Sequence, residues 1–121
     1  MKPLRIVVVE DDAVIAYLCG ELLESLGHEI CACVGCEAEA ICAAALHHPD
    51  LMIVDERIEG GSGVAAMSAI LETGHVPHVY VTGNVARVRA LAPGSVIIPK
   101  PYREDGLVAG IIEALNVKQA A

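Results

Sequence analysis

Residues 5–14 read RIVVVEDDAV, an apolar run that ends in three consecutive carboxylates, Glu10, Asp11 and Asp12. The Val-rich run is typical of a strand that is buried on both faces of a parallel sheet. Packing gives no reason for the acids that follow it, because neighbouring carboxylates repel one another and raise each other's pKa. Asp12 is explained as the N-cap of a helix that begins at Ala13. Glu10 and Asp11 therefore need a chemical explanation.

Four more short apolar runs follow along the chain, each bounded by turn residues. Together with the first run they predict five strands buried on both faces, at residues 4–9, 29–34, 51–54, 77–81 and 95–98. The segments between them have helical spacing. In the first of these, apolar residues recur every four positions and a C-cap glycine follows, at Val14, Leu18, Leu22, Leu26 and Gly27. Alternating strands and helices with short connections predict βαβ units and one parallel sheet.

Composition restricts the class of protein. The 121 residues fit one domain, with 55% hydrophobic residues and a mean hydropathy of +0.54. No stretch reaches the ~20 apolar residues of a membrane helix, and the N-terminus lacks the features of a signal peptide, so we expect a soluble, cytoplasmic protein. A net charge of −8 and the absence of Phe and Trp argue against direct nucleic-acid binding. An acidic protein instead suits a metal cation or a basic partner surface.

The cysteines and histidines suggest no site of their own. The five cysteines, an odd number without a secretory signal, argue against a disulfide framework. A soft metal site is conceivable, but we expect Cys31, Cys33 and Cys42 to be small core residues, and Cys36, in a loop, to be the candidate for reactivity. We expect the histidines to be solvated, namely His28, His47, His48, His75 and His78.

Polar residues gather where the predicted strands end. Glu10 and Asp11 follow the first strand, Asp55 ends the third, Thr82 ends the fourth and Lys100 follows the fifth. The carboxyl ends of parallel strands border the crevice in which open α/β sheets bind ligands. Three carboxylates in one crevice need a cation, and an all-oxygen donor set suits Mg²⁺. With a Lys and a Thr beside them, these residues suit phosphoryl transfer with an aspartate as nucleophile.

Four motifs stand in the order and at the spacing of one family, namely RIVVVEDD, PDLMIVDERIEGGSG, VYVTGN and IIPKPY. On these motifs the chain resembles, over essentially its whole length, the receiver domain of bacterial two-component response regulators, the CheY-like superfamily. The resemblance implies an α/β, flavodoxin-like fold, with a doubly wound five-stranded parallel sheet in the order 2-1-3-4-5 and five flanking helices. It also implies a single receiver domain over residues 1–121, without an output domain.

The resemblance also implies a metal-binding role for several residues. Asp55 is the expected phospho-acceptor and a Mg²⁺ ligand, and Asp11 is the expected direct ligand from the acidic pair. Glu10 is expected to act on the metal through water. Arg57 is expected to lend the metal its backbone carbonyl.

Two residues are implied to respond to the phosphoryl group. Thr82 is the expected switch hydroxyl that moves toward it, and Lys100 is the expected lysine that pairs with it. The Lys100–Pro101 bond resembles the family's cis peptide, which is physically reasonable because X–Pro bonds have a small cis penalty.

The function that follows from the resemblance is Mg²⁺-dependent phosphorylation of Asp55 by a histidine kinase or a histidine phosphotransfer protein. The phosphorylated domain would switch its contacts with a downstream protein target, without direct contact to nucleic acid or membrane. The protein would then be a signalling phospho-acceptor whose only chemistry is its own phosphorylation and dephosphorylation.

The chain departs from the family at the switch. The position three before the lysine is usually aromatic, and here it is Ile97. Tyr102 and Tyr80 are the candidates to replace the missing aromatic residue of the switch. Arg57 and Asn84 occupy positions that tune the lifetime of the phosphoryl group in the family, and the Arg57 guanidinium has acidic neighbours with which it could pair. The GGSG stretch at residues 60–63 predicts a flexible loop followed by a helix N-terminus, and it lacks the ending of a nucleotide-binding P-loop.

Three other classes of protein are alternatives to a phospho-accepting receiver domain. An aspartyl-nucleophile phosphatase or phosphotransferase usually carries an acid/base aspartate two residues after the nucleophile, where this chain has Arg57. A flavin-binding protein of similar topology would have a Ser/Thr-rich phosphate loop after the first strand, which is missing here. A receiver-like binding module that signals without phosphorylation is kept open by Ile97.

Overall fold

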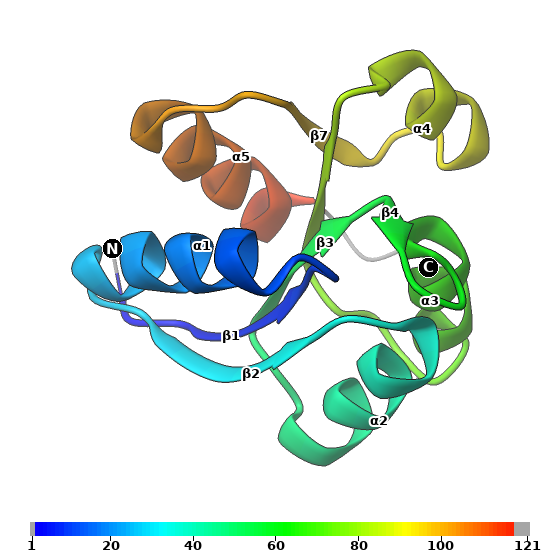
Figure 1. Cartoon of the computed structure of the whole chain (residues 1–121), viewed down its shortest axis with the longest axis horizontal. Helices are drawn as coiled ribbons and strands as arrows, with labels where there is room; N and C mark the ends of the chain where they lie inside the picture. The colour runs from blue at the N-terminus through cyan, green and yellow to red at the C-terminus, as the bar shows by residue number, and fades with distance from the viewer. Residues whose placement is uncertain (1, 118–121) are drawn as a thin grey trace.

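The computed structural model describes residues 2–117, over which strands and helices alternate (Figure 1). The strands are β1 (Arg5–Val9), β2 (Glu29–Val34), β3 (Leu51–Asp55), β4 (Arg57–Ile58), β5 (Gly61–Ser62), β6 (His78–Thr82) and β7 (Val96–Pro99). The helices are α1 (Ala13–Ser25), α2 (Glu37–His47), α3 (Gly63–Leu71), α4 (Val85–Leu91) and α5 (Glu104–Asn116). None of the helices in this range is long and apolar enough to cross a membrane.

The longer strands form one parallel sheet in the order β2-β1-β3-β6-β7. Because β6 and β7 are the fourth and fifth of these strands along the chain, this is the predicted order 2-1-3-4-5. The chain goes outward from β1 to β2 and then returns past β1 to β3. The direction of winding therefore reverses between β1 and β3, which is where open α/β sheets form a ligand crevice.

Helices cover both faces of the sheet, as Figure 1 shows for α1 and α5 on one side and α2 and α3 on the other. One apolar cluster joins the sheet to α1 and α5, and includes Leu23 and Ile111. The second joins it to α2, α3 and α4, and includes Ala40, Met67 and Val88. The side chains of β1 alternate between these clusters, because successive residues of a strand point to opposite faces.

The predicted burial was wrong for one strand and for the face of α1. Strand β2 lies at an edge of the sheet, so its residues are half-buried or exposed instead of buried on both faces. Helix α1 buries Ala16, Cys19, Gly20 and Leu23 and leaves Val14 and Leu18 67% and 60% exposed. The four-residue repeat identified the helix but not its buried face, because α1 is apolar on several sides and small residues let it approach the sheet.

The predicted positions of several cysteines and histidines were also wrong. Cys33 and Cys42 are exposed and Cys31 is half-buried, because β2 is an edge strand and α2 packs through alanines. His28 is 7% exposed, and its Nδ1 accepts a hydrogen bond of 3.0 Å from the backbone N–H of Leu4. His47 and His78 are half-buried, so three of the five histidines are not fully solvated.

The segment after Asp55 is ordered by a short antiparallel pair. Strands β4 and β5 pair Arg57 with Ser62 and Ile58 with Gly61 where the Gly-rich stretch predicted a flexible loop. The predicted helix N-terminus does follow, since the Ser62 hydroxyl accepts from Ala65 N and caps α3. Glycines at 60 and 61, both with positive φ, make the tight turn between the two strands.

Candidate functional site

The carboxyl edge of the sheet brings the predicted site residues together. Asp55 and Thr82 are the last residues of β3 and β6, while Glu10 and Lys100 directly follow β1 and β7. They border one cavity of about 1060 Å³, whose lining also includes Asp11, Asp12, Ile15, Glu56, Arg57, Asn84 and Arg87. Residues from four parts of the chain therefore share one site, as the strand ends predicted.

Asp55 is the centre of the charge network. Its carboxyl group is nearly buried, and its Oδ2 accepts a hydrogen bond of 2.7 Å from Lys100 Nζ. The other oxygen, Oδ1, accepts the backbone N–H of Arg57 at 3.1 Å. Lys100 Nζ also lies 3.6 Å from Glu10 Oε1. One partly exposed cation thus bridges two buried carboxylates, a charge-assisted arrangement that holds the Asp55 carboxyl group oriented.

The two partners of Asp55 titrate differently from free side chains. Burial, together with the neighbouring Asp55, raises the pKa of Glu10 to about 7. Burial alone would lower the pKa of Lys100, but its hydrogen bond with Asp55 and the charges of Asp55 and Glu10 raise it. The ionised form of Glu10 is therefore unfavourable in the site as it stands, and a cation bound beside Glu10 would favour that form.

The acidic residues after β1 have separate positions, as predicted. Asp12 Oδ1 accepts the backbone N–H groups of Val14 and Ile15 at 3.0 and 3.1 Å, which caps α1. The backbone N–H of Asp12 donates to Glu10 Oε2 at 3.2 Å, which fixes that carboxylate at the cavity wall. Asp11 is exposed and lines the cavity without taking part in the cap.

Thr82 links the cavity around Asp55 to α4. It is 4% exposed, and its Oγ1 accepts the backbone N–H of Asn84 at 2.9 Å. The Asn84 side chain in turn accepts the backbone N–H of Arg87 at 3.1 Å and caps α4. Movement of the Thr82 hydroxyl would therefore break a contact with the residue that begins α4. The predicted tuning position, Asn84, has this capping role in the structure.

Sequence reasoning offered Arg57 as a partner of Glu10 or Glu56 and missed Arg87. Within the described residues, the exposed Arg57 side chain forms no ion pair, and the cation nearest Glu56 is Arg87, with Nε 4.0 Å from Glu56 Oε1. Glu56 is 3% exposed. The available signal was position: Arg87 lies one helical turn after Asn84, on the helix that begins at the carboxyl edge.

The aromatic candidates for the switch occupy different faces of the sheet. Ile97 is half-buried and pairs in register with Tyr80, which is 2% exposed in the cluster below α2, α3 and α4. The Tyr80 ring contacts His78 edge-on at a centroid distance of 5.3 Å. Tyr102 is half-buried on the α1 side, in a small cavity shared with Glu10, Asp55 and Lys100. Of the three side chains, Tyr102 is therefore the one that shares a cavity with Asp55.

The donor set fits a hard cation. Within residues 2–117, no three His, Cys, Asp or Glu side chains lie close enough to form a metal site on their own. Mg²⁺, however, is commonly held by one or two carboxylates together with waters and a substrate phosphate. Glu10, Asp11 and Asp55 supply oxygen atoms around one cavity, which fits a hard cation. The Lys100–Pro101 bond is cis, as expected from the motif.

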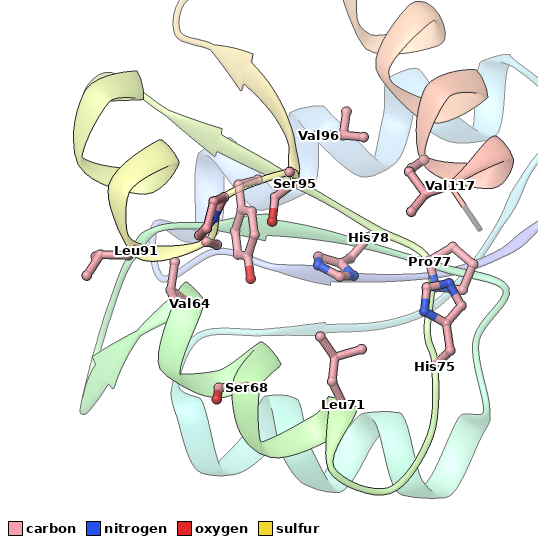
Figure 2. Close-up of a pocket in the computed structure, with 15 residues that line it drawn as sticks. Val64, Ser68, Leu71, His75, Pro77, His78, Leu91, Ser95, Val96 and Val117 are labelled. Carbon is pink, nitrogen blue, oxygen red and sulfur yellow. The ribbon is translucent and has the colours of Figure 1, made fainter. Parts of the chain in front are cut away.

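A second cavity, of about 460 Å³, lies at the opposite edge of the sheet (Figure 2). Figure 2 shows Val64 of α3 and Leu91 of α4 on its walls, with His75 and His78 at the start of β6. The His78 Nδ1 is hydrogen-bonded to the Val76 carbonyl at 2.8 Å. Of the residues singled out from the sequence, the switch candidate Tyr80 lines this cavity, whereas Glu10, Asp11, Asp55, Thr82 and Lys100 line the cavities at the carboxyl edge.

Comparison with known proteins agrees with this geometry. The family described as the response regulator receiver domain matches residues 6–112. Transcriptional regulatory protein PdtaR of Mycobacterium tuberculosis is 33% identical over 118 residues, covering 94% of this chain and 58% of that protein. Phyllosphere-induced regulator PhyR of Methylorubrum extorquens is 29% identical over 121 residues, covering 97% of this chain and 45% of that protein.

A solved structure shows the same fold. The REC domain of the Erythrobacter litoralis PhyR response regulator has a TM-score of 0.87 and 27% identity, covering 98% of this chain and 97% of that chain. The chain spans about half the length of the curated relatives it matches. The family match over residues 6–112 and the parallel sheet in the order β2-β1-β3-β6-β7 lead to one conclusion: the chain belongs to the response regulator receiver domain family.

Proposed function

We propose that this receiver domain accepts a phosphoryl group on Asp55 in a Mg²⁺-dependent reaction. The observation that carries the proposal is the Asp55 carboxylate at the end of β3, held 2.7 Å from Lys100 Nζ at the wall of an acidic cavity. A hydrogen-bonded and oriented carboxylate has the properties of an oxygen nucleophile.

The donor that fits this chemistry is a phosphohistidine. A carboxylate oxygen of Asp55 forms the new P–O bond while the P–N bond to the imidazole breaks, and the electron pair of that bond stays on the histidine nitrogen. Lys100 then pairs with the phosphoryl oxygens, and the Thr82 hydroxyl reaches them by leaving the Asn84 N–H.

Mg²⁺ bound at the carboxyl edge would supply the positive charge that phosphoryl transfer requires. Glu10, Asp11 and Asp55 are the side chains that would hold it, together with the backbone carbonyl of Arg57. Binding of the ion would also favour the ionised form of Glu10, whose pKa is raised by burial and by the neighbouring Asp55.

A protein donor fits the surface beside the site. Helix α1 exposes Val14, Tyr17 and Leu18, and Ile15 of the same helix lines the cavity that contains Asp55. An apolar helix face next to the acceptor suits docking of a histidine kinase or histidine phosphotransfer protein. The output is then a changed contact with a downstream protein, in the cytoplasm, because the new dianion acts on the loops after β3 and β6.

The test is phosphorylation by acetyl phosphate and loading with beryllofluoride, with and without Mg²⁺. We expect a mass increase of one phosphoryl group and Mg²⁺-dependent binding of beryllofluoride, both lost in Asp55→Asn. No modification and no loading of the wild-type chain at millimolar Mg²⁺ would support a receiver-like module that signals without phosphorylation.

Adjacent acidic residues provide a matched pair of variants. Asp11→Asn should raise the Mg²⁺ concentration needed for phosphorylation by at least about tenfold, because it removes a carboxylate from the proposed metal pocket. Asp12→Asn should leave phosphorylation unchanged, because asparagine is an equally good N-cap for α1. Equal effects of the two substitutions would contradict the assignment of Asp11 to the metal.

A further inference from the structure

Glu56, the residue after the acceptor, joins four elements of the fold. Its backbone N–H donates to Val81 O of β6 at 3.3 Å, and its carbonyl accepts Gly63 N at the start of α3 at 2.9 Å. Its side-chain Oε2 accepts Val64 N of α3 at 3.1 Å. The end of β3, the end of β6 and the first turn of α3 therefore meet at this one residue, and its side chain extends toward α4.

The second carboxylate oxygen of Glu56 lacks a hydrogen bond. Among the described residues, Glu56 Oε1 is the buried side-chain oxygen or nitrogen that has no hydrogen-bond partner. The nearest cation is the guanidinium of Arg87, 4.0 Å away and 61% exposed. A buried carboxylate with an unpaired oxygen is costly, so the approach of Arg87 offsets a penalty that the rest of the fold leaves in place.

Few other contacts hold α4 in place. The helix has seven residues, a length that is marginal without tertiary contacts, and Val88 is its buried residue. Its far end borders the 460 Å³ cavity, with Leu91 across from Val64 of α3 (Figure 2). The hydrogen bond from Asn84 N–H to Thr82 Oγ1 and the Arg87 side chain therefore attach α4 at its first turn, while Leu91 in its last turn is 52% exposed.

We propose that Glu56 and Arg87 form a latch, which ties the first turn of α4 to the acceptor loop in the unmodified protein and opens when Asp55 is phosphorylated. The opening half of this inference rests on the proposed function. Arg87 lines the same cavity as Asp55 and Thr82, so a phosphoryl dianion there competes with Glu56 for the guanidinium. When Thr82 and Arg87 both turn to the phosphoryl group, α4 loses both of its attachments at the first turn.

The latch is tested first in the unmodified full chain, by amide hydrogen exchange at Val88 and Ala92. These amides report on α4 because they donate to Asn84 O and Val88 O. Arg87→Gln should accelerate their exchange about fivefold, since it removes the cation. It keeps the backbone N–H of residue 87, which donates to the Asn84 side chain in the helix cap. Glu56→Gln should act in the same direction, and the double variant should exchange no faster than the faster of the single variants.

The matched control is Arg89→Gln, which removes the same charge from an exposed position on the same helix. Its exchange should stay within about twofold of wild type. If Arg87→Gln and Arg89→Gln behave alike, the latch is refuted. Glu56 is buried, so Glu56→Gln can fail to fold. The comparison of Arg87→Gln with Arg89→Gln, both at exposed positions, decides whether the latch exists without the Glu56 variant.

The opening of the latch is tested by adding beryllofluoride and Mg²⁺. Wild type and Arg89→Gln should exchange at Val88 and Ala92 at least about threefold faster when loaded, while Arg87→Gln should respond less, because only its Thr82–Asn84 hydrogen bond remains to be lost. An equal response of all three proteins would refute the opening of the latch. A wild-type chain that fails to bind beryllofluoride refutes the proposed function instead, and the first comparison still decides whether the latch exists.

Discussion

The two edges of the central sheet treat buried polar groups differently. At the carboxyl edge, Glu10, Asp55 and Glu56 are buried carboxylates that Lys100 and Arg87 only partly neutralise. At the amino edge, the buried polar side chain is a His28 ring that accepts one hydrogen bond from the backbone. The first edge holds buried carboxylates despite their desolvation cost, whereas the second edge buries a ring whose Nδ1 has a hydrogen-bond partner. The comparison teaches that reactive groups lie where the parallel strands end.

The largest effect on stability is expected at Gly63, whose backbone lies against the backbone of Asp55. A Cβ added at Gly63 would overlap Asp55 O and lie 2.7 Å from Val54 Cγ1, so Gly63→Ala should lower the free energy of unfolding by about 3 kcal/mol. Gly106→Ala in α5 is the control, because a Cβ there meets nothing within 4 Å. It should be neutral or stabilising by up to about 1 kcal/mol. Urea unfolding of both variants measures the difference, and equal losses would refute a special constraint at this edge.

Removal of the bridging cation tests whether the charges at the carboxyl edge are in excess. Lys100→Gln leaves Asp55 and Glu10 without their partner and should cost about 2 kcal/mol, less than a fully buried pair because Lys100 is partly exposed. Millimolar Mg²⁺ should restore more stability to this variant than to wild type, because Lys100 no longer competes for Asp55. Thermal unfolding with and without Mg²⁺ measures this. A variant that gains no more from Mg²⁺ than wild type would contradict a cation site at these carboxylates.

The amino edge should show its dependence on pH through His28. Burial lowers the pKa of His28, so the unfolded chain binds more protons than the folded chain between that lowered pKa and the ordinary value of 6.5. This contribution to stability is therefore present above pH 6.5 and is lost as the pH falls. Protonation also removes the acceptor of the Leu4 N–H, at a cost of about 1 kcal/mol.

His28→Asn offers a side-chain oxygen as acceptor that does not titrate. Between pH 7 and pH 5 the free energy of unfolding should fall for both proteins. The fall should be about 1 kcal/mol smaller for His28→Asn than for wild type. His75→Asn, at an exposed position, should follow wild type. Urea unfolding at the two pH values compares the slopes, and identical slopes for wild type and His28→Asn would show that this hydrogen bond does not control acid stability.

The smallest effect is expected at the wall of the amino-edge cavity. Leu91 is 52% exposed and borders the cavity instead of filling it. Leu91→Gln should therefore change the free energy of unfolding by less than about 0.5 kcal/mol. A loss above about 1.5 kcal/mol in urea unfolding would show that this wall belongs to the packed core.

Sequence reasoning predicted the strands and their ends better than the surfaces of the helices. The β1 run and the acids after it indicated a strand and a site, because a parallel strand is short, apolar and closed by polar residues. The partial exposure of β2 and the buried side of α1 were missed, since neither is encoded in a period of two or of four. The β4–β5 pair was missed because two-residue strands carry no pattern, and the pair forms only by contact.

The sequence by itself determined the order of strands and helices, the family resemblance and the meeting of Asp55, Thr82 and Lys100 at one edge. These follow from chain order once the sheet is parallel, because every strand then ends on the same side. The tertiary structure alone decided that Lys100 bridges Asp55 and Glu10, that Asn84 caps α4, and that Glu56 faces Arg87. Such pairings depend on distances of a few ångströms between elements far apart in the chain. No local pattern specifies them, because they are set by how helices and strands pack.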